Sequence, residues 1–181
     1  MDEQVQPQDW VETHLQHVAE AWPELDMTVE ALVTRLTKFG RYIERILTDT
    51  LKEFDLNQGE YKVLVNLKGT GDATCSPGDL CDRMLVSSGS MTNRLDRLEE
   101  AGLIQRRPDP NDRRGVIVEL TDEGDRLIEA AVYVQGRKEK RLFEDLSENE
   151  RESLEAILRK LLHSLESLYG PPPKKRVEAD A

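Results

Sequence analysis

Apolar residues recur at every third or fourth position along two long stretches of the chain, which is typical of amphipathic helices. In residues 28–51 these positions are Leu32, Leu36, Phe39, Ile43, Ile46 and Leu47. The second stretch follows Ser147 and Glu150, which have capping-box spacing, and it ends at Gly170 and three prolines. Its apolar positions are Leu154, Ile157, Leu158, Leu161, Leu162, Leu165 and Leu168. Because this face is wider than a surface helix needs, we expect a second copy of the chain to cover it.

Shorter helices between these stretches are predicted from their start and stop signals. Asn57 and Glu60 form another capping box, which opens a helix ending near Leu67. A serine cap followed by a proline opens a helix over residues 76–85, and a further helix covers residues 87–102. The buried stripe of this last helix is Met91, Leu95 and Leu98. Two helices joined by so tight a turn predict a helix-turn-helix.

Two short strands are predicted directly after this motif. They cover residues 103–107 and 115–120, and a loop rich in proline, aspartate and asparagine separates them. Flanking helices are predicted over residues 11–22 and 121–143. The fold is therefore expected to be mainly α-helical with a small β-hairpin wing, that is, a winged helix-turn-helix.

The net charge of −11 argues at first against a nucleic-acid partner, because phosphate binding requires lysine and arginine. The charge is unevenly distributed, however. Residues 1–60 carry 5 basic and 13 acidic groups, and residues 119–169 carry 8 and 13. Residues 61–118 carry 9 basic and 8 acidic groups. Since DNA responds to the field within roughly 10 Å, the middle of the chain remains a candidate DNA-binding segment.

One face of the helix over residues 87–102 is left for contacts with a partner. If the apolar stripe points inward, small hydroxyl, amide and guanidinium side chains remain on the outer and lateral sides. These are Ser87, Ser88, Ser90, Thr92, Asn93, Arg94 and Arg97. Such side chains reach base edges and phosphates, and small residues let a helix approach a groove closely. A solvated helix with ordinary caps is the alternative interpretation.

The tip of the predicted hairpin carries two adjacent arginines, Arg113 and Arg114, behind Asp112. Arginine is favoured in a narrow minor groove by the concentrated negative potential there. Asp112 is placed to pair with one of them and aim it. An exposed loop with a weak salt bridge is the alternative.

The order of these elements resembles the MarR family of transcriptional regulators. The resemblance lies in SPGDLCDRM, SSGSMTNRLDRLEEAGLI and DPNDRRGVIVELTDEG, which occur in the family's order and spacing within residues 57–124. It implies that residues 87–97 form the recognition helix and that Arg113 or Arg114 enters the minor groove. It also implies that the outer helices form a homodimer on double-stranded DNA with a near-palindromic operator, most simply as a repressor.

The resemblance also implies a division of the chain. Residues 1–56 and 121–169 contribute to dimerisation, residues 57–120 form the DNA-binding lobe, and residues 170–181 form a flexible tail.

A small organic-acid or phenolic ligand is a further implication of the resemblance. Trp22 and the N-terminal extension resemble features of a urate-responsive subgroup of the family. In that subgroup a tryptophan and arginines line the ligand pocket. Trp22, Arg94 and Arg106 are the corresponding candidates. Lys62 stands where that subgroup has an aspartate, which argues against urate itself. A hydrophobic anchor for the N-terminal helix is the favoured alternative for Trp22.

Other functional classes find little support in the sequence. It contains no glycine-rich phosphate loop or nucleophile elbow, so we expect no enzyme and no cofactor. His14 and His17 lie one helical turn apart without further ligands, which predicts exposed histidines and no metal site. Cys75 and Cys81 are interpreted as ordinary thiols. No apolar run is long enough to span a membrane, and the acidic N-terminus is unlike a signal peptide, so a cytoplasmic protein is expected.

A winged-helix module that binds proteins is the competing function, and the acidic surface favours it. The basic, small-residue face of residues 87–97 argues for DNA, because a protein-binding module does not need it.

Overall fold

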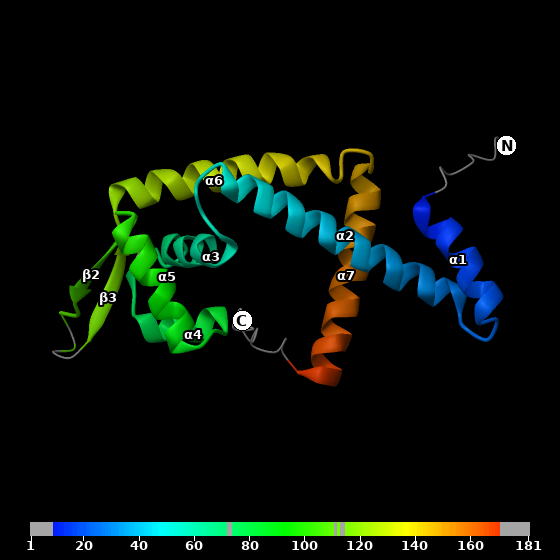
Figure 1. The fold of residues 1–181 in the computed structure, drawn as a ribbon, viewed down its shortest axis with the longest axis horizontal. Helices are drawn as coiled ribbons and strands as arrows, with labels where there is room; N and C mark the ends of the chain where they lie inside the picture. Colours follow the sequence, from blue (N-terminus) through cyan, green and yellow to red (C-terminus); the bar gives the residue numbers. More distant parts are fainter. Residues whose placement is uncertain (1–8, 72–73, 111, 113–114, 171–181) are drawn as a thin grey trace. The chain divides into compact units, whose positions relative to one another are not determined.

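The computed structural model of the chain describes residues 9–71, 74–110, 112 and 115–170 (Figure 1). The chain divides into two compact units, residues 1–46 and 47–181. The second helix begins in the first unit and ends in the second. Each unit is described by itself below.

The first unit contains α1 (Trp10–Ala21) and most of α2 (Met27–Lys52). Asp9 caps α1, because its carboxylate accepts a hydrogen bond from the Glu12 amide at 3.1 Å. The same carboxylate accepts two hydrogen bonds from Arg35 of α2, at 2.9 and 3.2 Å. The Arg35 hydrogen bonds hold the pKa of Asp9 below its ordinary value. One carboxylate thus both starts α1 and ties it to α2.

The second unit contains the predicted helix-turn-helix and hairpin. Its helices are α3 (Gln58–Lys68), α4 (Pro77–Met84), α5 (Ser88–Glu100), α6 (Asp122–Arg141) and α7 (Glu148–Tyr169). Its strands are β1 (Thr74–Cys75), β2 (Ile104–Pro108) and β3 (Val116–Leu120). Figure 1 shows the hairpin of β2 and β3 following α5. The predicted elements are therefore all present, with ends that differ by one or two residues.

The two-residue strand β1 was not predicted from the sequence. It pairs antiparallel with β3, with Cys75 opposite Val118, and completes a sheet of order β1-β3-β2. A segment this short has no periodicity to detect. Its pairing is with residues more than 40 positions later in the chain, so only the folded structure reveals it.

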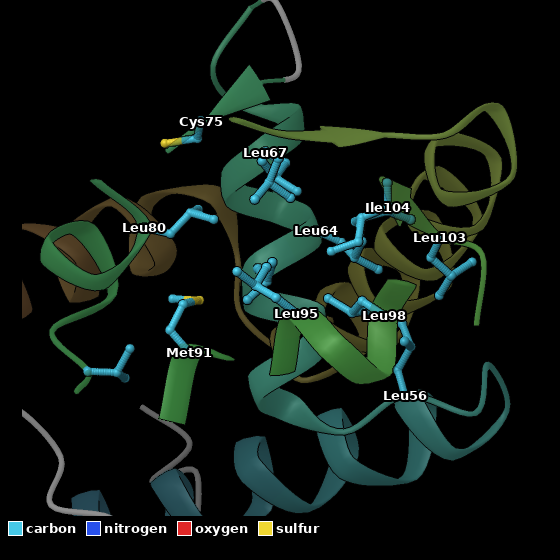
Figure 2. Close-up of a cluster of buried hydrophobic side chains, with 14 of the residues drawn as sticks. Leu56, Leu64, Leu67, Cys75, Leu80, Met91, Leu95, Leu98, Leu103 and Ile104 are labelled. Atoms are coloured by element: carbon cyan, nitrogen blue, oxygen red, sulfur yellow. The ribbon is translucent and has the colours of Figure 1, made fainter. Parts of the chain in front are cut away.

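The core of the second unit is an apolar cluster to which most of its helices and its sheet contribute (Figure 2). Met91, Leu95 and Leu98 are each 1% exposed, which confirms the predicted stripe of α5. The other labelled members are Leu56, Leu64, Leu67, Cys75, Leu80, Leu103 and Ile104. Because α5 buries one side here, its opposite side is turned to solvent.

The turn between α4 and α5 is tight. Leu85 adopts a left-handed conformation with φ of 53°, which ends α4. The Val86 amide then donates to the Cys81 carbonyl at 3.1 Å, and Ser87 caps the next helix. This confirms the predicted helix-turn-helix.

The last helix, α7, buries none of its residues. Its exposed large apolar side chains are Ile157, Leu161, Leu162, Leu165, Leu168 and Tyr169. The predicted unburied apolar face is thus present. Within the described residues, no helix is both long and apolar enough to cross a membrane.

Candidate nucleic-acid interface

The N-terminus of α5 is built from small hydroxyl residues. The Ser87 hydroxyl accepts a hydrogen bond from the Ser90 amide at 3.4 Å, which starts the helix. The first turn contains Ser88, Gly89 and Ser90 and no acidic residue. A helix start of this kind leaves amide groups available to an anion, and its side chains do not obstruct close approach.

The predicted contact residues of α5 lie on the side opposite its buried stripe or beside it. Ser87, Ser88, Thr92, Asn93 and Arg97 are exposed, and Ser90 and Arg94 are half-buried. The Thr92 hydroxyl donates to the Ser88 carbonyl at 3.0 Å, so its oxygen remains an acceptor. This face therefore offers donors and acceptors to a partner while the core holds the helix in place.

Two arginines of α5 run past the start of α3. A methyl group added at Gly59 would come within 2.7 Å of the Arg94 Nε, so the Arg94 side chain lies directly over this glycine. The Arg97 Nη1 is 3.9 Å from the Glu60 Oε1, and the Arg97 side chain is 72% exposed. Glu60 is nearly buried, but the pair is long and the guanidinium lies largely in solvent, so Arg97 keeps its charge available to solvent or an anion.

Arg106 of β2 connects the hairpin to α5. Its backbone amide donates to the Glu99 Oε1 at 3.0 Å, its Nη1 to the Glu99 Oε2 at 2.6 Å, and its Nη2 to the Asp96 Oδ1 at 2.7 Å. The side chain is only 27% exposed. Partial burial lowers the pKa of Arg106, but the hydrogen bonds and charges of Asp96 and Glu99 outweigh it and raise that pKa. Arg106 thus fixes the base of the wing to the last turns of α5.

The hairpin closes tightly at its tip. The Asp109 amide donates to the Gly115 carbonyl at 3.0 Å, and the Gly115 amide donates to the Asp112 carbonyl at 2.9 Å. A Cβ at Gly115 would lie 2.9 Å from the Asp109 Cβ, so glycine permits this closure. Arg113 and Arg114 lie outside the described residues, between Asp112 and Gly115.

The start of α6 packs against the link between α5 and β2. The Thr121 amide donates to the Leu103 carbonyl at 3.1 Å, and the Thr121 hydroxyl donates to the Gly102 carbonyl at 2.7 Å. A Cβ at Gly124 would lie 1.9 Å from the Leu103 oxygen, so only glycine fits there. Sequence reasoning used Thr121 as a cap and missed the role of Gly124, whose contact partner is more than 20 residues earlier.

The three candidate ligand residues are divided between the units. Trp22 belongs to the first unit, whereas Arg94 and Arg106 belong to the second. Trp22 is 61% exposed, so it is not a buried anchor within this chain. Arg106 already has two carboxylate partners, which favours a structural role for it.

The part of the chain that the structure describes contains no metal site, and both of its cysteines are free thiols. No group of three or more histidine, cysteine, aspartate or glutamate residues is arranged there to hold a metal ion. Burial raises the pKa of the Cys75 thiol, which disfavours its reactive thiolate form. Cys81 is also a free thiol.

Several known proteins are similar to this chain in both sequence and fold. Residues 56–116 match the sequence profile of the MarR family. The HTH-type transcriptional regulator PecS of Dickeya dadantii is 32% identical over 137 residues, covering 75% of this chain and 82% of PecS. The multiple antibiotic resistance protein MarR of Salmonella typhimurium is 35% identical over 120 residues, covering 66% of this chain and 82% of that protein. The chain belongs to the MarR family.

One of the similar solved structures is a complex with DNA. A mutant MarR from E. coli complexed with operator DNA has a TM-score of 0.62 and 30% identity, covering 75% of this chain and 96% of that chain. The predicted winged helix-turn-helix is thereby confirmed. This MarR-family protein is a DNA-binding transcriptional regulator, and its relatives are named as regulators rather than enzymes.

Proposed function

We propose that this MarR-family protein binds a near-palindromic operator as a homodimer. Each copy would place α5 in a major groove, with the two helices roughly 34–36 Å apart, or one turn of the duplex. The observation that carries this proposal is the outward face of α5, where small hydroxyl and guanidinium side chains stand opposite a fully buried stripe.

The residues of α5 divide by their chemistry. Ser87, Ser88 and Ser90 at the helix start suit phosphate oxygens, which helix N-termini attract. Thr92, Asn93, Arg94 and Arg97 suit base edges and neighbouring phosphates. The weak pairing of Arg97 supports this role, because little has to be broken for it to engage DNA.

The wing is proposed to reach the adjacent minor groove through Arg113 or Arg114. Support comes from the tight closure of the hairpin between Asp109 and Gly115, which are described residues on either side of the two arginines in the sequence. The ion pairs of Arg106 further support it, because they hold the hairpin base in a fixed orientation to α5.

Dimerisation is proposed to use residues 1–56 and 121–169, while residues 57–120 contact DNA. The tail expected over residues 170–181 lies outside the described residues, except for Gly170. The support is the exposed apolar face of α7, which a second copy would remove from water. Apolar residues of α2 are exposed in the same way, including Leu32, Leu36 and Phe39.

Repression is the proposed outcome of operator binding. A dimer that covers one operator would exclude polymerase from it, and two further relatives are named as transcriptional repressors. A small organic acid or phenol is proposed to release the DNA by favouring a dimer with the wrong helix spacing. Trp22 and Arg94 remain candidates for its contacts. A regulator of this kind works where the DNA is, so we place the protein in the cytoplasm.

The wing proposal is tested by the double variant Arg113→Ala/Arg114→Ala, with DNA from upstream of the protein's own gene as the target. Operator affinity is expected to fall at least about tenfold in moderate salt. The slope of log K against log salt concentration should also fall by about 1 for each phosphate that the variant no longer neutralises. Fluorescence anisotropy over a series of salt concentrations measures both quantities.

A matched control removes two adjacent cations at the far end of α6. Lys140→Ala/Arg141→Ala changes the net charge equally, about 28 Å along the helix from its start beside β3. This control should leave affinity and slope unchanged. Equal behaviour of the two double variants would reject the wing role. Absence of any specific binding by the unaltered protein would favour the protein-interaction module instead.

A further inference from the structure

The first turn of α3 lies beside the two arginines of α5 that are proposed to contact DNA. Helices α3 and α5 pack against one another in the second unit (Figure 1). Their contact places Gly59 next to Arg94 and Glu60 next to Arg97. Neither Gly59 nor Glu60 is itself a proposed DNA contact, so their position beside both arginines needs its own explanation.

Glu60 carries a buried negative charge. It is 7% exposed, and no other carboxylate of the described residues is buried. Its Oε2 accepts a hydrogen bond from the Asn57 amide at 2.9 Å, which closes the capping box of α3. Its other oxygen, Oε1, faces the Arg97 Nη1. Glutamine closes a capping box as well as glutamate does, so the cap by itself does not account for a charge that is costly to bury.

The Arg97 guanidinium is attracted by Glu60 without being hydrogen-bonded to it. The separation of 3.9 Å is too long for a hydrogen bond. The attraction is weak because solvent screens the exposed guanidinium, but it favours side-chain conformations that point toward Glu60. The N–H groups of Arg97 remain available to a base or a phosphate. The carboxylate can therefore bias the direction of this side chain without having to be displaced by DNA.

Gly59 makes room for the other arginine. A Cβ at this position would lie 2.7 Å from the Arg94 Nε and 3.0 Å from its Cζ, so the guanidinium end of Arg94 rests on the start of α3. The Arg94 side chain is accordingly half-buried. Glycine is a poor helix former, and a residue that weakens a helix while admitting an arginine fits a role in placing that arginine.

We propose that Gly59 and Glu60 are positioning residues that sharpen the sequence specificity of α5 by ordering Arg94 and Arg97 before DNA binds. Arginine reads guanine through two hydrogen bonds of fixed geometry, so an arginine that is already oriented loses less freedom on binding. The charge of Glu60 also disfavours binding through phosphates alone, because it lies beside a cation that would neutralise them. Both effects favour the operator over unrelated DNA.

This inference rests on the proposed entry of α5 into the major groove, but the two can be tested separately. The order of the arginines is a property of the free protein and is measured without DNA. Specific operator binding by the unaltered protein tests the proposed function. The change of specificity in the variants tests the inference.

The first experiment follows the Nε–H groups of Arg94 and Arg97 by NMR in the free protein, with signals assigned through Arg94→Lys and Arg97→Lys. The heteronuclear Overhauser effect reports how mobile each group is. Gly59→Ala is expected to shift the Arg94 signal and lower its Overhauser effect, because the new methyl group displaces the guanidinium. Glu60→Gln should do the same to Arg97, because it keeps the capping box and removes only the charge.

The second experiment compares the affinities of the same two variants for the operator and for an unrelated duplex of equal length. The ratio of the two affinities is expected to fall at least about threefold in each variant. Glu60→Gln should leave the affinity for the unrelated duplex unchanged or raise it, because a negative charge has been removed. In the Arg97→Ala background, Glu60→Gln should lower the ratio no further, because its target is already absent.

Two matched controls lie outside α3 and α5. Glu150→Gln neutralises the glutamate of the other capping box, at the start of α7. Gly136→Ala adds a methyl group to a helical glycine that has nothing within 4 Å of the new Cβ. Both should leave the arginine signals and the affinity ratio unchanged. Circular dichroism melting and sedimentation verify that every variant keeps the fold and the oligomeric state of the unaltered protein.

The inference is overturned if the arginine signals are the same in Gly59→Ala and Glu60→Gln as in the unaltered protein, or if the affinity ratio does not change. It is also overturned for Glu60 if Glu60→Gln lowers the ratio equally when Arg97 is already alanine. Absence of specific binding by the unaltered protein would instead reject the proposed function. The NMR signals would then still decide whether Gly59 and Glu60 order the two arginines.

Discussion

Two glycines of α6 differ in how much space surrounds the position where a Cβ atom would lie. Gly124 faces the Leu103 carbonyl so closely that a Cβ would lie 1.9 Å from its oxygen. Gly136, three turns later on the same helix, has nothing within 4 Å of that position. The first glycine is required by a backbone contact, and the second is not.

Gly124→Ala is therefore expected to destabilise the fold by at least about 2 kcal/mol, because the backbone at Leu103 cannot move aside cheaply. Gly136→Ala should stabilise it by roughly 0.5–1 kcal/mol, since alanine is the better helix former and meets no obstacle. Urea unfolding of the two variants measures both effects. Equal effects of the two substitutions would contradict the close approach at Gly124.

Ion pairs between helix α5 and strand β2 connect the helix-turn-helix to the hairpin. Arg106 of β2 makes these contacts, because its guanidinium donates hydrogen bonds to both Asp96 and Glu99 of α5. Its exposed neighbour Arg107 pairs instead with Glu119 of β3, at 3.0 Å, within the hairpin itself. Of these two adjacent arginines, only Arg106 pairs with α5, and it therefore holds the hairpin against that helix.

Arg106→Ala is expected to cost about 1–3 kcal/mol of stability, because it leaves two partly covered carboxylates without their cation. It should also weaken operator binding at temperatures where the variant is fully folded, because the wing loses its fixed orientation. Thermal melting and fluorescence anisotropy give the two quantities. An affinity equal to that of the unaltered protein would mean that Arg106 stabilises the lobe without positioning the wing.

Arg126→Ala is the control for this comparison. Arg126 pairs with Glu123 one helical turn away at the surface of α6, and both side chains are largely exposed. Such pairs contribute roughly 0–1 kcal/mol. This variant should change neither the melting temperature by more than a few degrees nor the operator affinity.

Large apolar side chains are exposed along both α2 and α7. The row of leucines along α7 continues over three turns, and none of these leucines is buried within the chain. Exposed apolar surface of this extent marks an interaction site. A second copy of the chain is the partner we propose for it.

Leu161→Glu/Leu165→Glu is expected to convert the dimer to a monomer in sedimentation experiments, because burying two carboxylates at an interface is costly. Operator affinity should fall with it, since one recognition helix cannot span both half-sites. Lys160→Glu changes the charge of the same helix by the same amount outside the leucine row. A dimer that survives the double leucine variant would place the interface elsewhere.

Most of the fold was predictable because its signals are local. Caps such as Asn57 and Ser147 act on amides three residues away, and both predicted capping boxes are present in the structure. The outward residues of α5 were likewise identified from the position of the apolar stripe alone. Which of them touch DNA remains a prediction, as does the role of Arg113 and Arg114.

Apolar periodicity and capping residues are local features of the sequence, and they were sufficient to predict the helices, the hairpin and the buried side of α5. Contacts between distant segments cannot be predicted from such local features. The pairing of Arg106 with Asp96 and Glu99, the strand at Thr74–Cys75 and the fit of Gly124 under Leu103 all depend on where folding brings remote residues. The reason is that helix and turn signals act within about one turn of chain. An ion pair or a close backbone approach between remote residues exists only once three-dimensional packing has brought them together.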